Sequence, residues 1–270
     1  MTVKKCKSLF LLIFNLFIGA ITLVSSGHAH AQADIPAIAA ASDLQFALEA
    51  ITVRFRGETR KDVRLSFGSS GNYFRQIEQG APFQLFLSAD EDFVLRLHQA
   101  GKTKDRGRLY AIGRIVLFAP KGSPLNVDEQ MAGLREAVAG NRISRFAIAN
   151  PEHAPYGRAA EQALRKLGLW DALQGRMVLG ENVSQAAQFA ASGSTQGGIF
   201  AYSLALSPSV SKQGRYVLLP EDLHQPLRQR MVLVKGAGET AHAFYAWLQQ
   251  PAARKIFEQY GFKLPVGAPG

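Results

Sequence analysis

Four short segments combine small or hydroxyl-bearing residues with the start of a helix-like apolar pattern. They are Ala40-Ala41-Ser42-Asp43, Gly68-Ser69-Ser70-Gly71, Ala154-Pro155-Tyr156-Gly157 and Glu181-Asn182-Val183-Ser184. The first N–H groups of a helix have no partner within the helix, and that end carries a partial positive charge. Helix N-termini therefore bind anions readily. Four of them in one chain indicate a site for a small anion, built from hydroxyl and backbone donors.

Each segment also has a purely structural interpretation. Ser42, Ser70 and Asn182 are good N-cap residues, and a cap stabilises its own helix by about 1 kcal/mol. Gly68 and Gly71 suit a tight turn that needs positive φ. Taken one at a time, capping is the simpler interpretation. The anion-site hypothesis depends on the four segments together and on the lack of a competing catalytic motif in the sequence.

The sequence holds no familiar catalytic pattern. The Gly68–Gly71 segment lacks the Gly-x-Ser-x-Gly spacing of a nucleophile elbow. Zinc-binding His spacings and a phosphate-binding Gly-x-x-x-x-Gly-Lys-Ser/Thr loop are also missing. We therefore expect no enzyme activity, no catalytic residue and no bare metal ion. One alternative stays open, a periplasmic serine hydrolase that uses Ser70 with His153 as the base.

The first residues predict a cleaved signal peptide, residues 1–31. Lys4, Lys5 and Lys7 precede an apolar run over 9–24, and a small-x-small pattern ends at Ala31. The run has 16 residues, fewer than the roughly 20 of a membrane span. Cleavage after Ala31, or after Ala33, would release the remaining chain into the periplasm.

Charge and cysteine content limit the classes of function. The chain has 31 Lys+Arg and 21 Asp+Glu, and removal of the three leader lysines leaves 28 − 21 = +7. A basic protein attracts anions, but no Lys/Arg cluster is interleaved with aromatics, so we expect no nucleic-acid partner. The one cysteine, Cys6, lies in the predicted leader. The mature chain would therefore have no disulfide and no thiol chemistry.

After the leader, short β-like runs alternate with helical runs, which predicts an α/β fold with mostly parallel sheets flanked by helices. We expect strands near 35–41, 62–67, 83–87, 115–119, 146–149, 177–179, 198–201, 215–219 and 231–234. We expect helices near 44–55, 72–80, 92–99, 157–167, 183–191, 241–248 and 251–260. In open α/β sheets ligands lie at the carboxyl ends of strands, so the four segments could share one cleft.

Several stretches resemble the periplasmic molybdate-binding proteins of bacterial ABC transporters, and the likeness extends over essentially the whole mature chain. The most specific is Ala149-Asn150-Pro151-Glu152-His153-Ala154-Pro155-Tyr156-Gly157. The others are Ala39–Leu44, Ser66–Asn72, Gln76–Phe83, Leu87–Asp90, Gly180–Val183 and Phe257–Phe262. The resemblance implies a two-lobed type II periplasmic binding protein with the ligand in the cleft between lobes. Lobe 1 would comprise 34–112 plus 225–264, and lobe 2 would comprise 113–224.

The resemblance also implies a ligand, partners and site residues. The ligand would be molybdate, and tungstate as well, without any cofactor, and the partners would be this oxyanion and a membrane permease. The protein would be a monomer. By position, the molybdate-binding residues would be Ser42, Asp43 through its backbone, Ser70, Tyr156 and Val183.

Three points at this site stay open. Ser69 is a candidate neighbour whose contact with the anion the resemblance leaves undecided. Some relatives use a tyrosine from a later strand; that position is Ala201 here, with Tyr202 one step on, so we expect Tyr156 to supply the phenol. Asp43 is unusual, because a carboxylate beside a dianion is unfavourable, and sulfate or phosphate remains an alternative ligand.

Overall fold

The computed structural model describes residues 35–265. The predicted signal peptide, residues 1–31, lies outside them, so its cleavage remains a prediction. Within the described residues, no helix is both long enough and apolar enough to span a membrane.

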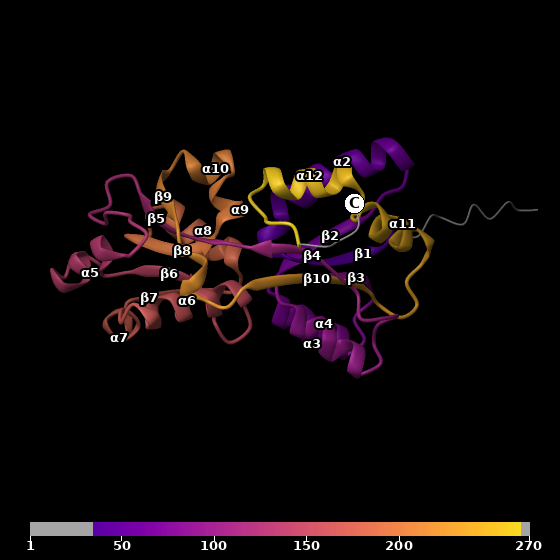
Figure 1. Cartoon of the computed structure of the whole chain (residues 1–270), viewed down its shortest axis with the longest axis horizontal. Coiled ribbons are helices and arrows are strands. Elements are labelled where there is room, and N and C mark those ends of the chain that lie inside the picture. The colour runs from indigo at the N-terminus through magenta and orange to yellow at the C-terminus, as the bar shows by residue number, and fades with distance from the viewer. Residues whose placement is uncertain (1–34, 266–270) are drawn as a thin grey trace, which may run out of the picture. The chain divides into compact units, whose positions relative to one another are not determined.

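The first of two sheets has the strand order β2-β1-β3-β10-β4. Its strands are β1 (Ala37–Ala41), β2 (Arg64–Gly68), β3 (Phe83–Ser88), β4 (Arg108–Gly113) and β10 (Leu227–Leu233). β1 pairs parallel with β2 and β3, whereas β10 pairs antiparallel with β3 and β4. Four strands therefore run in one direction, and only β10 runs in the other (Figure 1).

Side chains of this sheet alternate between two apolar layers, as the twofold period of a strand requires. Ile38 and Leu85 belong to the larger core, whereas Ala39 and Phe86 belong to a smaller one on the opposite face. The larger core includes residues of α2 (Gln45–Thr59), α11 (Glu239–Trp247) and α12 (Pro251–Gln259). The smaller includes residues of α3 (Ser70–Glu78) and α4 (Glu91–Gln99). The sheet is thus covered by helices on both faces.

The second sheet repeats this pattern with the order β7-β6-β8-β5-β9. Its strands are β5 (Ile115–Pro120), β6 (Phe146–Ala149), β7 (Met177–Gly180), β8 (Gly197–Ala201) and β9 (Gly214–Leu218). β6 pairs parallel with β7 and β8, and β5 pairs antiparallel with β8 and β9. One strand per sheet is reversed, which agrees with the expected mostly parallel α/β fold.

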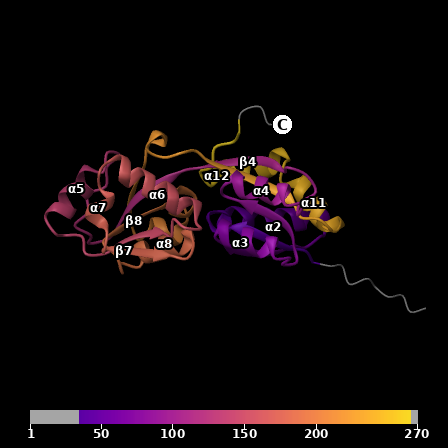
Figure 2. The ribbon, with the colours of Figure 1, turned by 90° about the horizontal axis from the view of Figure 1, so that it is seen from below.

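Helices α6 and α8 pack on strands β6 and β8 of the second sheet (Figure 2). The helices of this part of the chain are α5 (Ala132–Ala139), α6 (Pro155–Lys166), α7 (Trp170–Leu173), α8 (Val183–Ala191), α9 (Tyr202–Ala205) and α10 (Pro208–Ser211). Two short 3-10 helices complete the list: η1 (Ser42–Leu44) and η2 (Glu221–Leu223).

The chain passes between the two sheets at two places. Only Arg114 separates β4 of the first sheet from β5 of the second, and the chain returns through η2 to β10. Both crossings lie near the predicted lobe boundaries, 112/113 and 224/225. The exact lobe limits, 34–112 plus 225–264 and 113–224, remain a prediction.

Candidate functional site

The four predicted turns all stand at the junction of a strand or loop with the start of a helix. Ser42 opens η1 directly after β1, and Ser70 is the first residue of α3 after β2. Tyr156 is the second residue of α6, and Val183 is the first residue of α8. The carboxyl ends of β1, β2 and β7 thus lead into three of these helix starts, as the strand-turn-helix pattern predicts.

The capping interpretation is correct for only one of the three residues to which it applied. Asn182 caps α8, and its side chain accepts a hydrogen bond from the Gln185 N–H at 3.1 Å. The cap of α3 is Ser69 rather than Ser70, and η1 has no side-chain cap. The hydroxyl groups of Ser42 and Ser70 are therefore not explained by capping of their own helices.

All five predicted site residues line one small cavity. Ser42, Asp43 and Ser70 come from the first-sheet half of the molecule, and Tyr156 and Val183 come from the second. The remaining lining residues are Ala41, Gly68, Ser69, Ala89, Ala154 and Pro155. The described lining contains no Lys, Arg or His, so any anion held here must be bound by hydroxyl and N–H groups. The structure shows the residues together; their contact with a ligand remains a prediction.

The two serine hydroxyls are oriented by backbone N–H groups. The Ala89 N–H donates to the Ser70 Oγ at 2.9 Å, and the Ser184 N–H donates to the Ser42 Oγ at 3.2 Å. Both serines are buried, with exposed fractions of 0% and 2%. Because each oxygen accepts from the backbone, its own hydrogen stays available as a donor. A buried hydroxyl arranged in this way is suited to bind an acceptor such as an oxyanion.

Two backbone N–H groups add to this donor set. Within the described part of the chain, the N–H groups of Tyr156 and Val183 make no backbone hydrogen bond, because each lies in the first turn of its helix. A contact of the Asp43 N–H with a bound anion remains a prediction. The cavity therefore offers two hydroxyls and two free amides without counting Asp43.

The hydroxyl of Tyr156 makes two hydrogen bonds within the protein. It donates to the Asp43 Oδ2 at 2.9 Å and accepts from the Gln229 Nε2 at 3.0 Å. It also lies against Gly113 at the end of β4, where a Cβ atom would stand only 2.2 Å from it. The phenol is thus engaged with Asp43 and β10 in this structure, and the Tyr156 N–H makes no backbone hydrogen bond among the described residues. A contact of the phenol with the anion remains a prediction. Tyr202 does not line the cavity; its ring lies under the Arg114 guanidinium.

Asp43 belongs to a buried polar network that the sequence did not reveal. Gln229 of β10 donates to the Asp43 Oδ2 at 2.7 Å, and its own oxygen accepts from the Tyr110 hydroxyl at 2.7 Å. Ser203 donates to the Asp43 carbonyl oxygen at 2.7 Å. The carboxylate oxygen Oδ1, by contrast, is buried without a hydrogen-bond partner among the described residues. Gln229 and Tyr110 are functional candidates missed at the sequence level.

Burial dominates the ionisation of this network. Loss of water raises the pKa of Asp43 from 3.8 to about 6, and the bonds from Gln229 and Tyr156 offset only part of that effect. Burial and the neighbouring Asp43 together raise the pKa of Tyr156 and that of Tyr110 well above 10. Both tyrosines are therefore neutral at ordinary pH, and Asp43 is the group of the cavity that titrates near neutrality.

His153 contacts a serine, but not the one required by the hydrolase alternative. Its Nδ1 lies 3.0 Å from the Oγ of Ser69, while Ser70 is bonded to Ala89. The carbonyl oxygen of His153 accepts from the Gly71 N–H at 2.9 Å, and a Cβ on Gly71 would stand 2.6 Å from that oxygen. His153 thus joins its loop to the start of α3, and glycine at position 71 permits the close approach.

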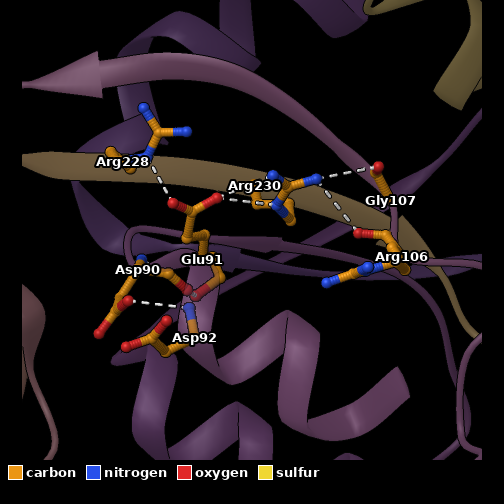
Figure 3. A network of polar contacts seen from close by, with 8 residues as sticks. Asp90, Glu91, Asp92, Arg106, Gly107, Arg228 and Arg230 are labelled. Atoms are coloured by element: carbon orange, nitrogen blue, oxygen red, sulfur yellow. Dashed lines mark hydrogen bonds and ion pairs between the residues drawn. The ribbon is translucent and has the colours of Figure 1, made fainter. Parts of the chain in front are cut away.

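A second cavity lies beside α4 and is of a different chemical kind. Its lining includes Asp90, Glu91, Arg158 and Arg228. Glu91 accepts from Arg228, and from Arg230 at 2.8 Å, while Arg230 also donates to the carbonyl oxygens of Arg106 and Gly107 (Figure 3). Arg158 pairs with Asp90. Because these cations are already paired with carboxylates, this cavity is a poor site for a free dianion.

The cavity lined by the five predicted residues is narrow. Its volume is about 10 Å³, close to the minimum that a single water molecule needs. An oxyanion must therefore move the walls apart. The walls come from both halves of the molecule, and within the described residues the halves are joined at two crossings, β4–β5 and η2–β10, an arrangement that permits hinge motion between them.

Two α/β halves with a donor-lined cavity between them define the class of extracytoplasmic solute-binding proteins. Residues 37–263 match the family model described as bacterial extracellular solute-binding protein, and the chain belongs to this family. The expectation of a binding protein rather than an enzyme agrees with that membership.

Individual relatives show which solute-binding proteins the chain resembles. The chain is 36% identical over 237 residues to the "Molybdate-binding protein ModA" of Azotobacter vinelandii, covering 87% of this chain and 92% of that protein. It is 33% identical to the protein of the same name from Escherichia coli, covering 93% and 97%. The solved structure of the Azotobacter vinelandii periplasmic molybdate-binding protein superposes with a TM-score of 0.77 at 34% identity, covering 85% and 99%. These relatives confirm the resemblance to molybdate-binding proteins.

Proposed function

We propose that this protein captures molybdate, and tungstate as well, in the cavity lined by Ser42, Asp43, Ser70, Tyr156 and Val183. The observation that carries the proposal is the convergence of two buried hydroxyls and two free helix-start N–H groups, from both halves of the chain, on one cavity without a described Lys or Arg. Hydrogen-bond donors held in a dry site stabilise a bound dianion without a cation. The names of the most similar relatives support molybdate as the ligand.

The proposed setting follows from the family and the predicted leader. The protein would act as a monomer in the periplasm, without a cofactor and without nucleic acid, and would deliver the anion to the permease of an ABC transporter. No metal cation is needed, and within residues 35–265 no three His, Cys, Asp or Glu side chains group as a metal site. Molybdenum would be bound only as its oxyanion.

Discrimination between anions depends on protons and size. Molybdate carries no proton near neutral pH and accepts hydrogen bonds only, whereas phosphate keeps at least one proton that needs an acceptor. A buried donor-only site leaves that proton unpaired, which costs about 1–3 kcal/mol. Sulfate has no proton, so only its smaller size disfavours it. The Asp43 carboxyl lines the cavity and its Oδ1 has no hydrogen-bond partner among the described residues, so this oxygen is an acceptor that could favour phosphate instead.

Calorimetric titration of the mature protein with molybdate, tungstate, sulfate and phosphate at one pH tests the proposal. We expect tight binding of molybdate and tungstate, with sulfate and phosphate weaker by at least about tenfold, the equivalent of 1.4 kcal/mol. Phosphate binding that is tighter than molybdate binding, and that is lost in Asp43→Asn, would instead make the protein a phosphate-binding protein. Hydrolysis of an ester or phosphoester substrate would favour the serine-hydrolase alternative.

A further inference from the structure

Asp43 is an acid placed inside a cavity that otherwise presents donors. It is 1% exposed and lines the cavity beside Ser42 and Ser70. Its Oδ2 accepts two hydrogen bonds, from Tyr156 and Gln229, whereas its Oδ1 is buried without a partner in the described chain. A buried, ionised carboxylate oxygen without a donor is costly, and a second negative charge beside it would add to the cost. A proton on Oδ1 removes both costs.

Within residues 35–265, no cation acts on the Asp43 carboxyl to keep it ionised. The groups that act on its carboxyl are the amide of Gln229, the hydroxyl of Tyr156 and the backbone N–H of Asp43 itself, and none of them carries a charge. Tyr110 lies behind Gln229, and α8, which packs against η1, has no titratable residue. The charged groups on the other neighbouring elements are exposed or paired. Glu49 and Arg64 are exposed. Arg158 pairs with Asp90, and Arg228 and Arg230 both pair with Glu91. Tyr202 of α9 lies under Arg114, and His153 contacts Ser69 and Glu181.

We infer that Asp43 binds the oxyanion as a neutral carboxylic acid, with its proton on Oδ1, so that capture of each anion takes up one proton from solvent. The inference rests on the proposed function, because it takes the cavity to be the dianion site. Gln229 and Tyr110 are positioning residues in this scheme. The Gln229 oxygen is held by the Tyr110 hydroxyl, so its N–H group faces the Asp43 Oδ2. Oδ2 thus remains the acceptor, and Oδ1 receives the proton.

The direction of the pH effect follows from linkage. In the free protein burial raises the pKa of Asp43 to about 6, so the carboxyl is mostly ionised at pH 8 and must be protonated when the anion binds. A bound dianion raises this pKa further, because like charges disfavour the ionised form. Affinity should therefore weaken as pH rises above 6, approaching about tenfold per pH unit for one proton taken up.

The test is calorimetric titration with sodium molybdate between pH 6.5 and 8.5, in pairs of buffers that differ in ionisation enthalpy. At pH 8 we expect an uptake of about one proton per anion in the wild-type protein and near none in Asp43→Asn. The amide of Asp43→Asn is neutral at every pH, so its affinity should stay level, and near pH 6 the two proteins should bind alike. Asp171→Asn, which removes an exposed acid in α7, should keep the wild-type proton uptake.

An infrared difference spectrum gives a second readout that does not depend on affinity. Molybdate added at pH 8 should produce the carbonyl band of a protonated carboxylic acid in the wild type and in Asp171→Asn, and no such band in Asp43→Asn. If Asp43→Asn does not fold, the wild-type proton count and band decide alone. Molybdate binding at pH 8 without proton uptake, or uptake that persists in Asp43→Asn, would overturn the inference. Absence of molybdate binding at every pH would refute the proposed function, and the inference with it.

Discussion

The Ser70 hydroxyl provides the sharpest test of how the cavity holds an anion. Its oxygen accepts from the Ala89 N–H at 2.9 Å, and its hydrogen is free to donate into the cavity that Ser70 lines. Ser70→Ala removes both interactions at once. The two losses appear in different measurements, because the Ala89 bond exists with or without ligand, whereas the proposed bond to the anion exists only in the complex.

The expected magnitudes follow from the partners. The buried Ala89 N–H is left without its acceptor, which should lower the free energy of unfolding by about 1–3 kcal/mol. The anion loses one hydrogen bond to a charged acceptor, worth about 1.5–3 kcal/mol. At 1.4 kcal/mol per decade, the Kd for molybdate should rise roughly 10- to 150-fold. Ser42→Ala should behave in the same way, because the Ser42 oxygen accepts from the Ser184 N–H.

The assay is calorimetric titration with molybdate at a temperature well below the unfolding transition, paired with denaturant unfolding. Ser207→Ala is a matched control: its buried hydroxyl donates to the Leu204 carbonyl oxygen at 2.8 Å, and Ser207 does not line the cavity. This control should lose stability and keep its affinity. If Ser70→Ala also loses stability while binding molybdate as tightly as the wild type, the hydroxyl serves only the Ala89 N–H, and the proposed donor role is wrong.

Three further outcomes are expected. Tyr156→Phe should lower the free energy of unfolding by about 1–3 kcal/mol, because the buried Asp43–Gln229 network loses a member. At pH 6 it should change the molybdate Kd by less than about threefold, equivalent to 0.7 kcal/mol, since the backbone N–H is retained. A loss of affinity above tenfold would show the phenol to be a ligand. In the folded state the pKa of Asp43 lies above its unfolded value of 3.8. The contribution of Asp43 to the free energy of unfolding is therefore full below about pH 4 and is lost as pH rises through 6, by about 3 kcal/mol. Urea melts of wild type and Asp43→Asn should diverge by this amount between pH 4 and 7, and parallel curves would contradict the assignment. Gly71→Ala should weaken molybdate binding, because its Cβ would stand 2.6 Å from the His153 carbonyl oxygen and either the start of α3 or the loop of His153 must shift. A titration showing unchanged affinity would mean that this close approach is not needed for binding.

The sequence predicted the parts of the fold that depend on local pattern. The helix 183–191 was placed at its observed bounds because Asn182 and the apolar spacing both mark it. Within each sheet the convergence of the helix starts was also predictable, since the carboxyl ends of parallel strands meet on one edge. The meeting of the two edges at one cavity depends on how the two sheets pack. Strand β4 and helices α5, α7, α9 and α10 were not predicted. β4 is held by pairing with β10, more than 100 residues away along the chain, and such long-range pairing leaves little local signal.

The buried network around Asp43 was the main part of the site that the sequence did not reveal. Gln229 is fully buried in β10, in the same alternating set of buried positions as Leu227 and Met231. A polar residue at an inward position of an alternating strand was the available signal, but its partners Asp43 and Tyr110 lie 186 and 119 residues away. The bond from the Tyr156 hydroxyl to Asp43 was not predictable for the same reason, because its acceptor lies 113 residues away along the chain.

The most direct test of the central claim is a thermal melt of the mature protein with molybdate at about 100 times its Kd. A ligand bound only by the folded state then adds about 2.7 kcal/mol. For a chain of this size that corresponds to a rise in melting temperature of about 5–11 °C. Molybdate and tungstate should produce this rise, and chloride at equal ionic strength should not. A melting temperature unchanged by both molybdate and tungstate would contradict the assignment of the cavity as their binding site.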